Sequence, residues 1–83
     1  MSYCVYMLKS LGKKSVTYVG YTKNFSNRIR LHNSGKGAKF TRGRKWRVIY
    51  KEKLASKNKA ISREYYIKKN RTLRNKIKNK KKL

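Results

Sequence analysis

Residues 3–21, YCVYMLKSLGKKSVTYVGY, contain two runs of β-branched and aromatic residues separated by a short turn segment. The runs are YCVYMLK at 3–9 and SVTYVGY at 15–21, and the segment SLGKK at 10–14 contains a glycine. Such residues favour strands, and a glycine-containing break of this length favours a hairpin. The stretch therefore predicts two antiparallel strands that form the base on which the other elements pack.

A short helix is predicted directly after the hairpin. Asn24 is a suitable N-cap, and Gly35 is a suitable stop for a helix over Phe25–Ser34. Phe25 and Ile29 lie four residues apart in it, which puts them on one stripe. We expect this stripe to cover the sheet.

Further elements follow in the second half of the chain. GKGAKFTRGRK at 35–45 combines glycines with cations and predicts a flexible loop suited to lie along phosphates, and WRVIYKE at 46–52 predicts a third strand. Ser56 can cap a second helix from Lys57 to about Lys69, and TLRNKIKNKKKL at 72–83 predicts a third helix that frays into a basic tail. One face of the second helix is expected to hold Ala60, Ile61, Glu64, Tyr65 and Lys68, and Glu64 is expected to face the sheet together with Ala60 and Ile61.

The order of these elements defines a fold class. It predicts a small α+β protein with a three-stranded antiparallel sheet flanked by helices, in the order β-β-α-β-α-α. A chain of 83 residues has room for one domain. We expect residues 1–70 to form that domain and residues 71–83 to be its basic C-terminal helix and tail.

The charge of the chain points to an anionic partner. It has 26 Lys and Arg residues against 2 acidic residues, a formal net charge of +24, so self-repulsion opposes compaction in the absence of a polyanion. DNA or RNA is the partner that this charge fits best, because every neutralised phosphate releases counterions. A peptide that binds a membrane surface or another polyanion is a weaker alternative, since the basic segment NKIKNKKKL at 75–83 has only two large apolar residues.

The compartment is expected to be the cell interior. The single cysteine, Cys4, cannot form an intramolecular disulfide, and the first ten residues contain too short an apolar run for a signal peptide or a membrane span. We expect a soluble intracellular protein, in the cytoplasm or associated with the nucleoid, with no membrane partner and no small-molecule cofactor.

The scarcity of acidic and metal-binding residues restricts the chemistry. Glu52 and Glu64 are the only acids, which argues against a two-metal nuclease within one chain. His32 is the only histidine, so with Cys4 it cannot supply the four ligands of a zinc finger, and HNH-type sites need more than one histidine. No spacing supports a Ser or Cys hydrolase triad.

A single-metal design remains possible for chemistry on phosphate. One glutamate can hold a hydrated Mg²⁺, and an arginine can stabilise the pentacovalent phosphorus. A tyrosine surrounded by cations is expected to have a lowered pKa, because positive charge favours the phenolate, and could then act as a general base.

Two tyrosine motifs lie on the predicted hairpin. Val5-Tyr6 is followed, after eleven intervening residues, by Tyr18-Val19-Gly20. Together they resemble the paired signature of the GIY-YIG nuclease superfamily, with Cys4 in place of the first glycine.

The resemblance extends over residues 3–69 and is closest to small stand-alone members, which are similar to the nuclease domain of structure-selective endonucleases. It implies a metal-dependent DNA endonuclease that acts on branched or nicked DNA, in repair, recombination or mobile-element biology. The later motifs that carry it are Tyr21-Thr22-Lys23-Asn24, Arg28, His32, HNSGKGAKFTRG at 32–43, and KAISREYYIKK at 59–69, which contains Glu64.

The resemblance implies a role for each site residue. Tyr6 is expected to be the general base, Tyr18 a supporting hydroxyl and Arg28 the group that stabilises the phosphate. His32 is expected to assist at the substrate or in proton relay, and Glu64 to hold Mg²⁺ or Mn²⁺. A glycine at position 20 is expected to let the backbone approach the site.

DNA is the expected partner. Because the sequence lacks the zinc-binding and DNA-targeting domains of larger relatives, substrate selectivity is expected to come from this domain or from a targeting protein partner. The residues expected to contact DNA lie in the cationic loop and near the end of the second helix. They are Lys36, Lys39, Thr41, Arg42, Arg44, Lys68 and Lys69.

Every site residue also has a purely structural interpretation. The two tyrosines can be packing residues, Arg28 a solvated cation and His32 a structural histidine. Glu64 can pair with Lys68 four residues later, and Glu52 is expected to pair with a neighbouring lysine. A basic nucleic-acid-binding protein that keeps the GIY-YIG fold without catalysis is therefore the alternative function.

Overall fold

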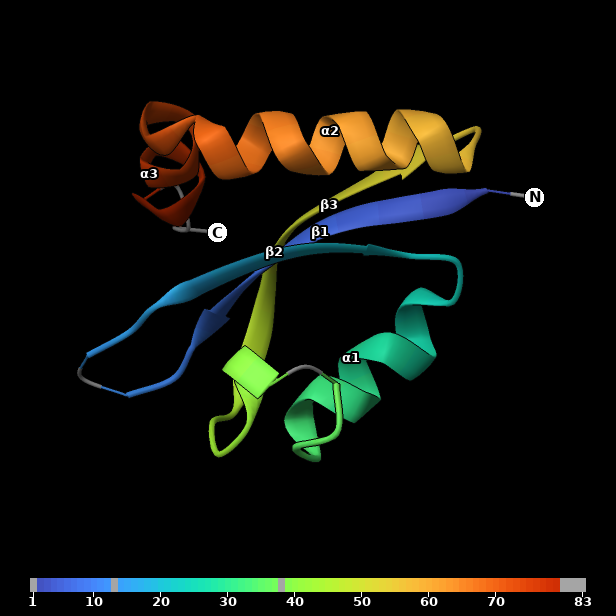
Figure 1. Cartoon of the computed structure of the whole chain (residues 1–83). Helices are drawn as coiled ribbons and strands as arrows, with labels where there is room; N and C mark the ends of the chain where they lie inside the picture. Colours follow the sequence, from blue (N-terminus) through green and yellow to red (C-terminus); the bar gives the residue numbers. More distant parts are fainter. Residues whose placement is uncertain (1, 13, 38, 80–83) are drawn as a thin grey trace.

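The predicted order of elements is found in the computed structural model (Figure 1). The structure describes residues 2–12, 14–37 and 39–79, with the backbone alone at Lys39. The α+β fold class predicted from the sequence is confirmed. The elements are β1 (Tyr3–Ser10), β2 (Thr17–Thr22), α1 (Phe25–Asn33), the 3₁₀ helix η1 (Lys39–Thr41), β3 (Trp46–Leu54), α2 (Lys57–Lys69) and α3 (Arg71–Asn79).

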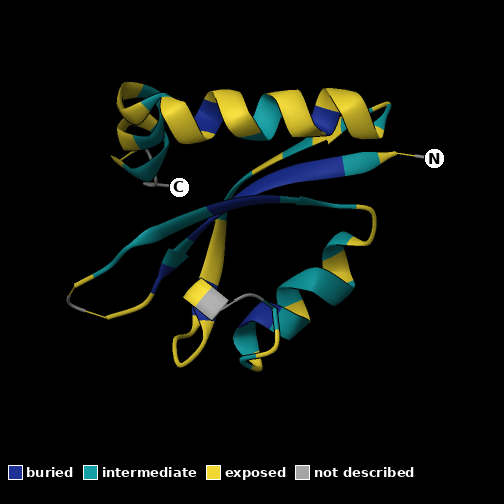
Figure 2. Ribbon diagram, viewed as in Figure 1, coloured by how far each residue is buried: buried dark blue, intermediate teal, exposed yellow. Residues whose placement is uncertain are grey.

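The sheet has the strand order β2-β1-β3, and β1 pairs antiparallel with both neighbours. Because β1 is the central strand, its residues Cys4–Leu8 are all buried, as the dark segment in Figure 2 shows. Alternate side chains of a strand point to opposite faces, so β1 supplies both faces of the sheet. Figure 1 shows α2 on one face and α1 on the other.

The two faces have separate cores. On the α2 face, the buried residues are apolar: Val5, Met7, Val19, Ala60 and Ile67. On the α1 face, the buried residues Tyr6, Leu8 and Trp46 pack against partly buried Phe25 and Ile29. The predicted contact of Phe25 and Ile29 with the sheet is confirmed.

Helix caps are found where the sequence predicts them. The Asn24 side chain accepts a hydrogen bond from the backbone N–H of Asn27, and the Ser56 side chain accepts one from that of Lys59. α1 ends at Asn33, and Gly35 follows with φ of 85°, a left-handed conformation that a glycine adopts without strain.

The buried face of α2 differs from the prediction. Ala60 and Ile67 are its buried residues, whereas Ile61 and Tyr65 are exposed. The predicted face was wrong because the helix turns its Ala60–Ile67 line toward β1 and β2, which leaves Ile61 and Tyr65 beyond the contact.

α3 packs against the apolar core on the α2 face of the sheet, through partly buried Leu73 and Ile77. The predicted tail at 80–83 lies outside the described residues. No helix in the described part of the chain is long and apolar enough to span a membrane.

Candidate active site

Tyr6 lies at the centre of the α1 face and is fully buried. Its partner across the sheet is Gly20 on β2. A Cβ atom at position 20 would lie 2.7 Å from the Tyr6 hydroxyl oxygen and 2.9 Å from Cζ, which is closer than real Cβ contacts. Gly20 is therefore required by the space that the Tyr6 phenol occupies.

Three buried side chains form a continuous hydrogen-bonded chain. The Tyr6 hydroxyl lies 2.9 Å from His32 Nε2, and His32 Nδ1 lies 2.8 Å from Thr41 Oγ1. All three residues have no exposed surface, although they come from β1, α1 and η1. This chain connects elements that are far apart in the sequence.

His32 is held in its neutral form. Burial, and then the nearby Arg28 cation, lower the pKa of the His32 imidazole below its usual value. A guanidinium can only donate, so the Tyr6 oxygen accepts from Arg28 and its own hydrogen is directed to His32 Nε2. We therefore assign the remaining imidazole hydrogen to Nδ1, from which it is donated to Thr41 Oγ1.

The pKa of Tyr6 moves in the direction opposite to our expectation. Burial raises the pKa of the Tyr6 phenol to about 12, although its interaction with the Arg28 guanidinium works to lower it. The charges of Tyr18 and Glu64 add to the increase. The lowered tyrosine pKa expected from the basic composition was wrong for Tyr6, because loss of hydration outweighs the attraction of one nearby cation.

Arg28 interacts with both phenols of the site. Its pKa is raised, first by its interaction with Tyr6 and further by the Tyr18 hydroxyl, since both favour the charged guanidinium. Arg28 is half-buried, and its Nε atom is buried without a hydrogen-bond partner within the described residues. Its cation is therefore held at the site with a donor that the protein does not satisfy.

The loop after α1 closes over His32. A Cβ atom at Gly37 would overlap the imidazole ring, so a larger residue would displace either the loop or the histidine. The indole N–H of buried Trp46 donates to the Thr41 backbone carbonyl at 3.0 Å, which fixes η1 against β3. Sequence reasoning missed both contacts, although a glycine five residues after the sole histidine was a signal available in it.

Glu64 acts on the same site from α2. Its side chain is 18% exposed and pairs with Lys68 at 3.3 Å, as the structural interpretation of the sequence predicts. Its carboxylate also raises the pKa of Tyr6, so its field reaches the phenol although α2 covers the opposite face of the sheet. It lies on the side of α2 that also bears Lys68, a residue that lines a hollow with β2.

The other acid has a structural role. Glu52 Oε1 accepts hydrogen bonds from Arg63 Nε at 2.8 Å and from the Tyr50 hydroxyl at 2.7 Å. Burial works to raise the pKa of the Glu52 carboxyl, but these hydrogen bonds and the Arg63 charge lower it overall. The lysine partner predicted from the sequence was wrong, because α2 packs close enough to β3 to supply an arginine.

The donor set fits a divalent cation that needs one protein carboxylate. No three His, Cys, Asp or Glu side chains gather in the part of the chain that the structure describes. Mg²⁺ retains several waters and combines one carboxylate with substrate phosphate oxygens, so Glu64 is a sufficient protein ligand. A cation that binds to Glu64 would share the carboxylate with the Lys68 ammonium or displace it.

The expected DNA contacts fall into two groups. Lys36, Arg42, Arg44, Lys68 and Lys69 are exposed. The Lys39 side chain lies outside the part that the structure describes. Thr41 was predicted to contact DNA, but it is fully buried and holds His32 instead, since η1 turns its side chain toward α1.

Comparisons with known proteins found a family model, related sequences and a similar fold. Residues 2–80 match the model of the GIY-YIG catalytic domain. A UPF0213 protein of Clostridium perfringens is 50% identical over 66 residues, which are 78% of this chain and 69% of that protein. A UPF0213 protein of Oceanobacillus iheyensis is 43% identical over 65 residues, 77% of this chain and 73% of that protein. The solution NMR structure of a UPF0213 protein from Bacillus halodurans is similar, with a TM-score of 0.57 at 37% identity, over 98% of this chain and 86% of that one.

Proposed function

The chain belongs to the GIY-YIG family, and from this membership we propose that it is a metal-dependent endonuclease that hydrolyses phosphodiester bonds in DNA. The observation that carries the proposal is the convergence of Arg28, Tyr6 and His32 in one buried network, on which Glu64 acts from another helix. A protein that only needed a packed core would gain nothing from burying these polar groups together.

Arg28 and Tyr18 are the groups that contact the phosphodiester in this proposal. Both are half-buried, whereas Tyr6 is fully enclosed. The Arg28 guanidinium stabilises the negative charge that develops on the phosphate oxygens, and a phosphate oxygen is the acceptor that the unpartnered Nε lacks.

The Tyr6 oxygen is enclosed in the free protein, and in this proposal it becomes accessible when the Arg28 guanidinium turns from it to the phosphate. Tyr6 and His32 then together accept the proton of the attacking water. With a pKa of about 12, Tyr6 stays neutral at physiological pH. It can take a proton on its oxygen only as it passes its own hydrogen to His32 Nε2, 2.9 Å away. The water oxygen forms its bond to phosphorus, the bond to the leaving oxygen breaks, and the leaving oxygen takes a proton from solvent water. The imidazolium is held through Nδ1 by Thr41 until it returns the proton through Tyr6 to solvent.

Glu64 is the residue that would hold Mg²⁺ or Mn²⁺. When bound, the cation supplies positive charge beside the phosphate oxygens. The exposed cations of the loop, with a net charge of +24 over the chain, supply the sequence-independent affinity for DNA. We propose branched or nicked DNA in repair or recombination as the substrate class, reached alone or through a targeting protein.

Cleavage assays test the proposal directly. The purified protein is incubated with nicked, flapped and supercoiled DNA in Mg²⁺, Mn²⁺ or EDTA, beside Arg28→Ala, Glu64→Ala and Glu52→Gln variants. We expect metal-dependent products with the wild type and with Glu52→Gln, and at least about 100-fold less product with the other two. Circular dichroism establishes that each variant is folded. Equal product from wild type and Glu64→Ala would contradict the proposal.

A basic nucleic-acid-binding protein without turnover is the second candidate. The ion pair that engages Glu64 with Lys68 and the raised pKa of Tyr6 favour it, because both oppose catalysis by the free protein. It predicts salt-dependent DNA binding with no product on any substrate in either metal. The same assay therefore separates the two functions.

A further inference from the structure

Phe40 is an exposed aromatic residue held in a fixed orientation beside the site. Its side chain is 55% exposed, yet its ring stacks on Tyr18 with centroids 6.0 Å apart and planes 22° apart. The centroid of the buried Trp46 ring lies 6.2 Å from that of Phe40. Exposure of a large apolar ring is unfavourable, and this ring is held by two other aromatic rings while more than half of it stays accessible to a partner.

A hollow of about 290 Å³ lies next to Phe40. It is lined by Thr17, Tyr18 and Val19 of β2 and by Phe40 on one side, and by Lys68 and Arg74 on the other. Arg74 donates to the backbone carbonyls of Ile67 and Lys68, which holds its side chain at the end of α2. The hollow thus combines an aromatic surface with two cations, Lys68 of α2, which also pairs with Glu64, and Arg74 of α3.

This combination matches one nucleotide. An aromatic ring stacks on the face of a base, and Lys and Arg side chains bind the phosphate attached to it. In a continuous duplex the base faces are covered by neighbouring base pairs, so a base must be unstacked to present its face to Phe40. An unpaired base does so without the cost of breaking a base pair.

We propose that this hollow binds an unpaired nucleotide that flanks the scissile phosphodiester. The position of the scissile bond rests on the proposed function. Tyr18 joins the two sites, because it lines the hollow and also interacts with Arg28. The substrate class that follows is DNA with single-stranded nucleotides at the cleavage point, such as flaps and gaps.

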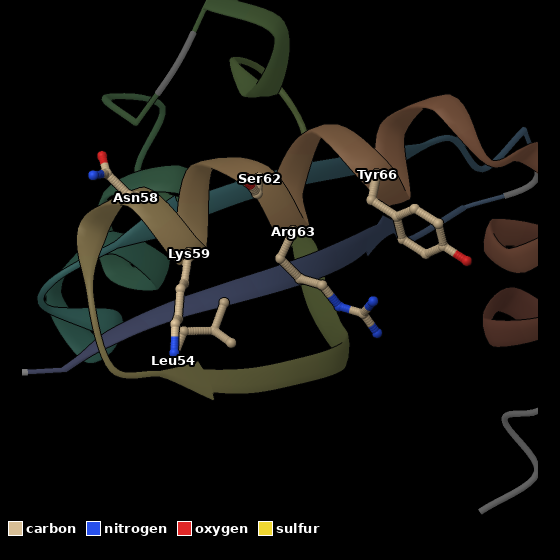
Figure 3. A pocket seen from close by; sticks show the side chains of 6 residues that line it. All are labelled: Leu54, Asn58, Lys59, Ser62, Arg63 and Tyr66. Carbon is tan, nitrogen blue, oxygen red and sulfur yellow. The ribbon is translucent and has the colours of Figure 1, made fainter.

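The other side of α2 supplies a matched control. A second hollow, of about 490 Å³, is lined by Leu54, Arg63, Tyr66 and their neighbours, as Figure 3 shows. Tyr66 is 50% exposed, similar to Phe40, but the Arg63 guanidinium beside it is already bound by Glu52. Removing the Tyr66 ring therefore tests the loss of an exposed aromatic residue far from the proposed nucleotide.

The binding test uses a short single-stranded DNA oligonucleotide that contains one 2-aminopurine, in EDTA, with the full chain. We expect stacking on Phe40 to quench the 2-aminopurine fluorescence. Phe40→Ala should lose the quenching and weaken binding about 10-fold, whereas Phe40→Trp and Tyr66→Ala should retain both. Phe40→Leu, which keeps an apolar side chain without an aromatic face, should behave as Phe40→Ala and guards against a folding effect.

The outcomes distinguish this proposal from the proposed function. Because EDTA excludes metal, quenching that depends on Phe40 supports the nucleotide site even if the protein cleaves nothing. The proposal is overturned if Phe40→Leu quenches the fluorescence as strongly as the wild type does. It is also overturned if the same oligonucleotide is quenched equally within a full duplex. Tighter binding of the RNA version would overturn the assignment to DNA. If cleavage occurs, Phe40→Leu should lower the rate on a flap more than on a nick, and an equal decrease would count against the proposal.

Discussion

The two faces of the sheet are built from the same central strand but bury different kinds of group. The α2 face buries only apolar side chains, such as Met7 and Ile67. The α1 face buries Tyr6 together with the polar His32 and Thr41. Apolar burial stabilises the fold without further conditions, whereas buried polar groups are tolerated only when each one has a partner. The first face thus serves stability, and the second has the features of a reactive site.

The side chains of β1 point alternately to the two faces of the sheet, and this alternation produces the difference. Val5 and Met7 point to α2, while Tyr6 and Leu8 point to α1. A shift of one residue in its register would exchange the two faces, so the position of the Tyr6 phenol on the α1 face depends on the pairing of Tyr6 with Gly20. Changes on the two faces should consequently have separable effects on stability and on activity.

The largest effect is expected from Arg28→Ala on the α1 face. Removing the cation that stabilises the developing charge should lower the DNA cleavage rate about 10²- to 10³-fold, with a small change in unfolding free energy. Single-turnover cleavage and thermal unfolding measure the two quantities. Arg30→Ala, an exposed residue of the same helix, is the control and should keep the wild-type rate. A comparable loss in both variants would mean that only the general charge of the helix matters.

On the α2 face, a substitution is expected to lower stability and to leave the cleavage rate almost unchanged. Ile67→Ala removes a fully buried side chain and should lower the unfolding free energy by about 2–5 kcal/mol. At a temperature where the variant stays folded, its cleavage rate should remain close to wild type. Ile61→Ala, at a position 41% exposed, should change stability by less than about 0.5 kcal/mol. Chemical denaturation checks both values, and equal destabilisation would contradict the assigned orientation of α2.

A smaller effect is expected where the two strands of the hairpin meet. Gly20→Ala should destabilise the protein by about 1–3 kcal/mol, because the new methyl group overlaps the Tyr6 hydroxyl. Combining it with Tyr6→Phe removes the nearest atom and should recover part of this loss. A double-mutant cycle by denaturation measures the coupling, and strict additivity of the two changes would show that the hydroxyl is not the obstacle.

The smallest effect concerns pH. The folded-state pKa of His32 is lowered, so the unfolded chain binds a proton at higher pH than the folded protein does. The stability contribution is fully present above about pH 6.5 and is lost as pH falls below that value toward the folded-state pKa. His32 is the only histidine, so this window has one titrating side chain. As the pH is lowered from 8 to 5, the melting temperature should decrease for wild type and change less for His32→Gln. An equal dependence of melting temperature on pH in both proteins would contradict the lowered pKa of His32.

Much of the fold could be predicted because the relevant signals are local. The hairpin, the caps at Asn24 and Ser56, and the third strand beginning at Trp46 depend on neighbouring residues, and the structure confirms them. The GIY-YIG resemblance was also carried by motifs in a fixed order, and the match over residues 2–80 confirms it. The site roles assigned from that resemblance stay predictions.

The errors share a different origin. Thr41 was expected to contact DNA and is buried against His32, and Glu52 was expected to bind a lysine and binds Arg63 on α2. Each error concerns a contact between segments at least nine residues apart in the chain. Side-chain spacing along one element contains no information about such contacts.

The sequence by itself determined the order of elements, the family and the strongly basic charge, because these follow from local propensity, motif spacing and composition. Tertiary structure decided which groups lose water and which charges they then meet. The raised pKa of Tyr6 is the clearest case: composition predicted a decrease, and burial on the α1 face produced an increase. Desolvation depends on every element packed around a group, so it is settled only when the strands and helices come together.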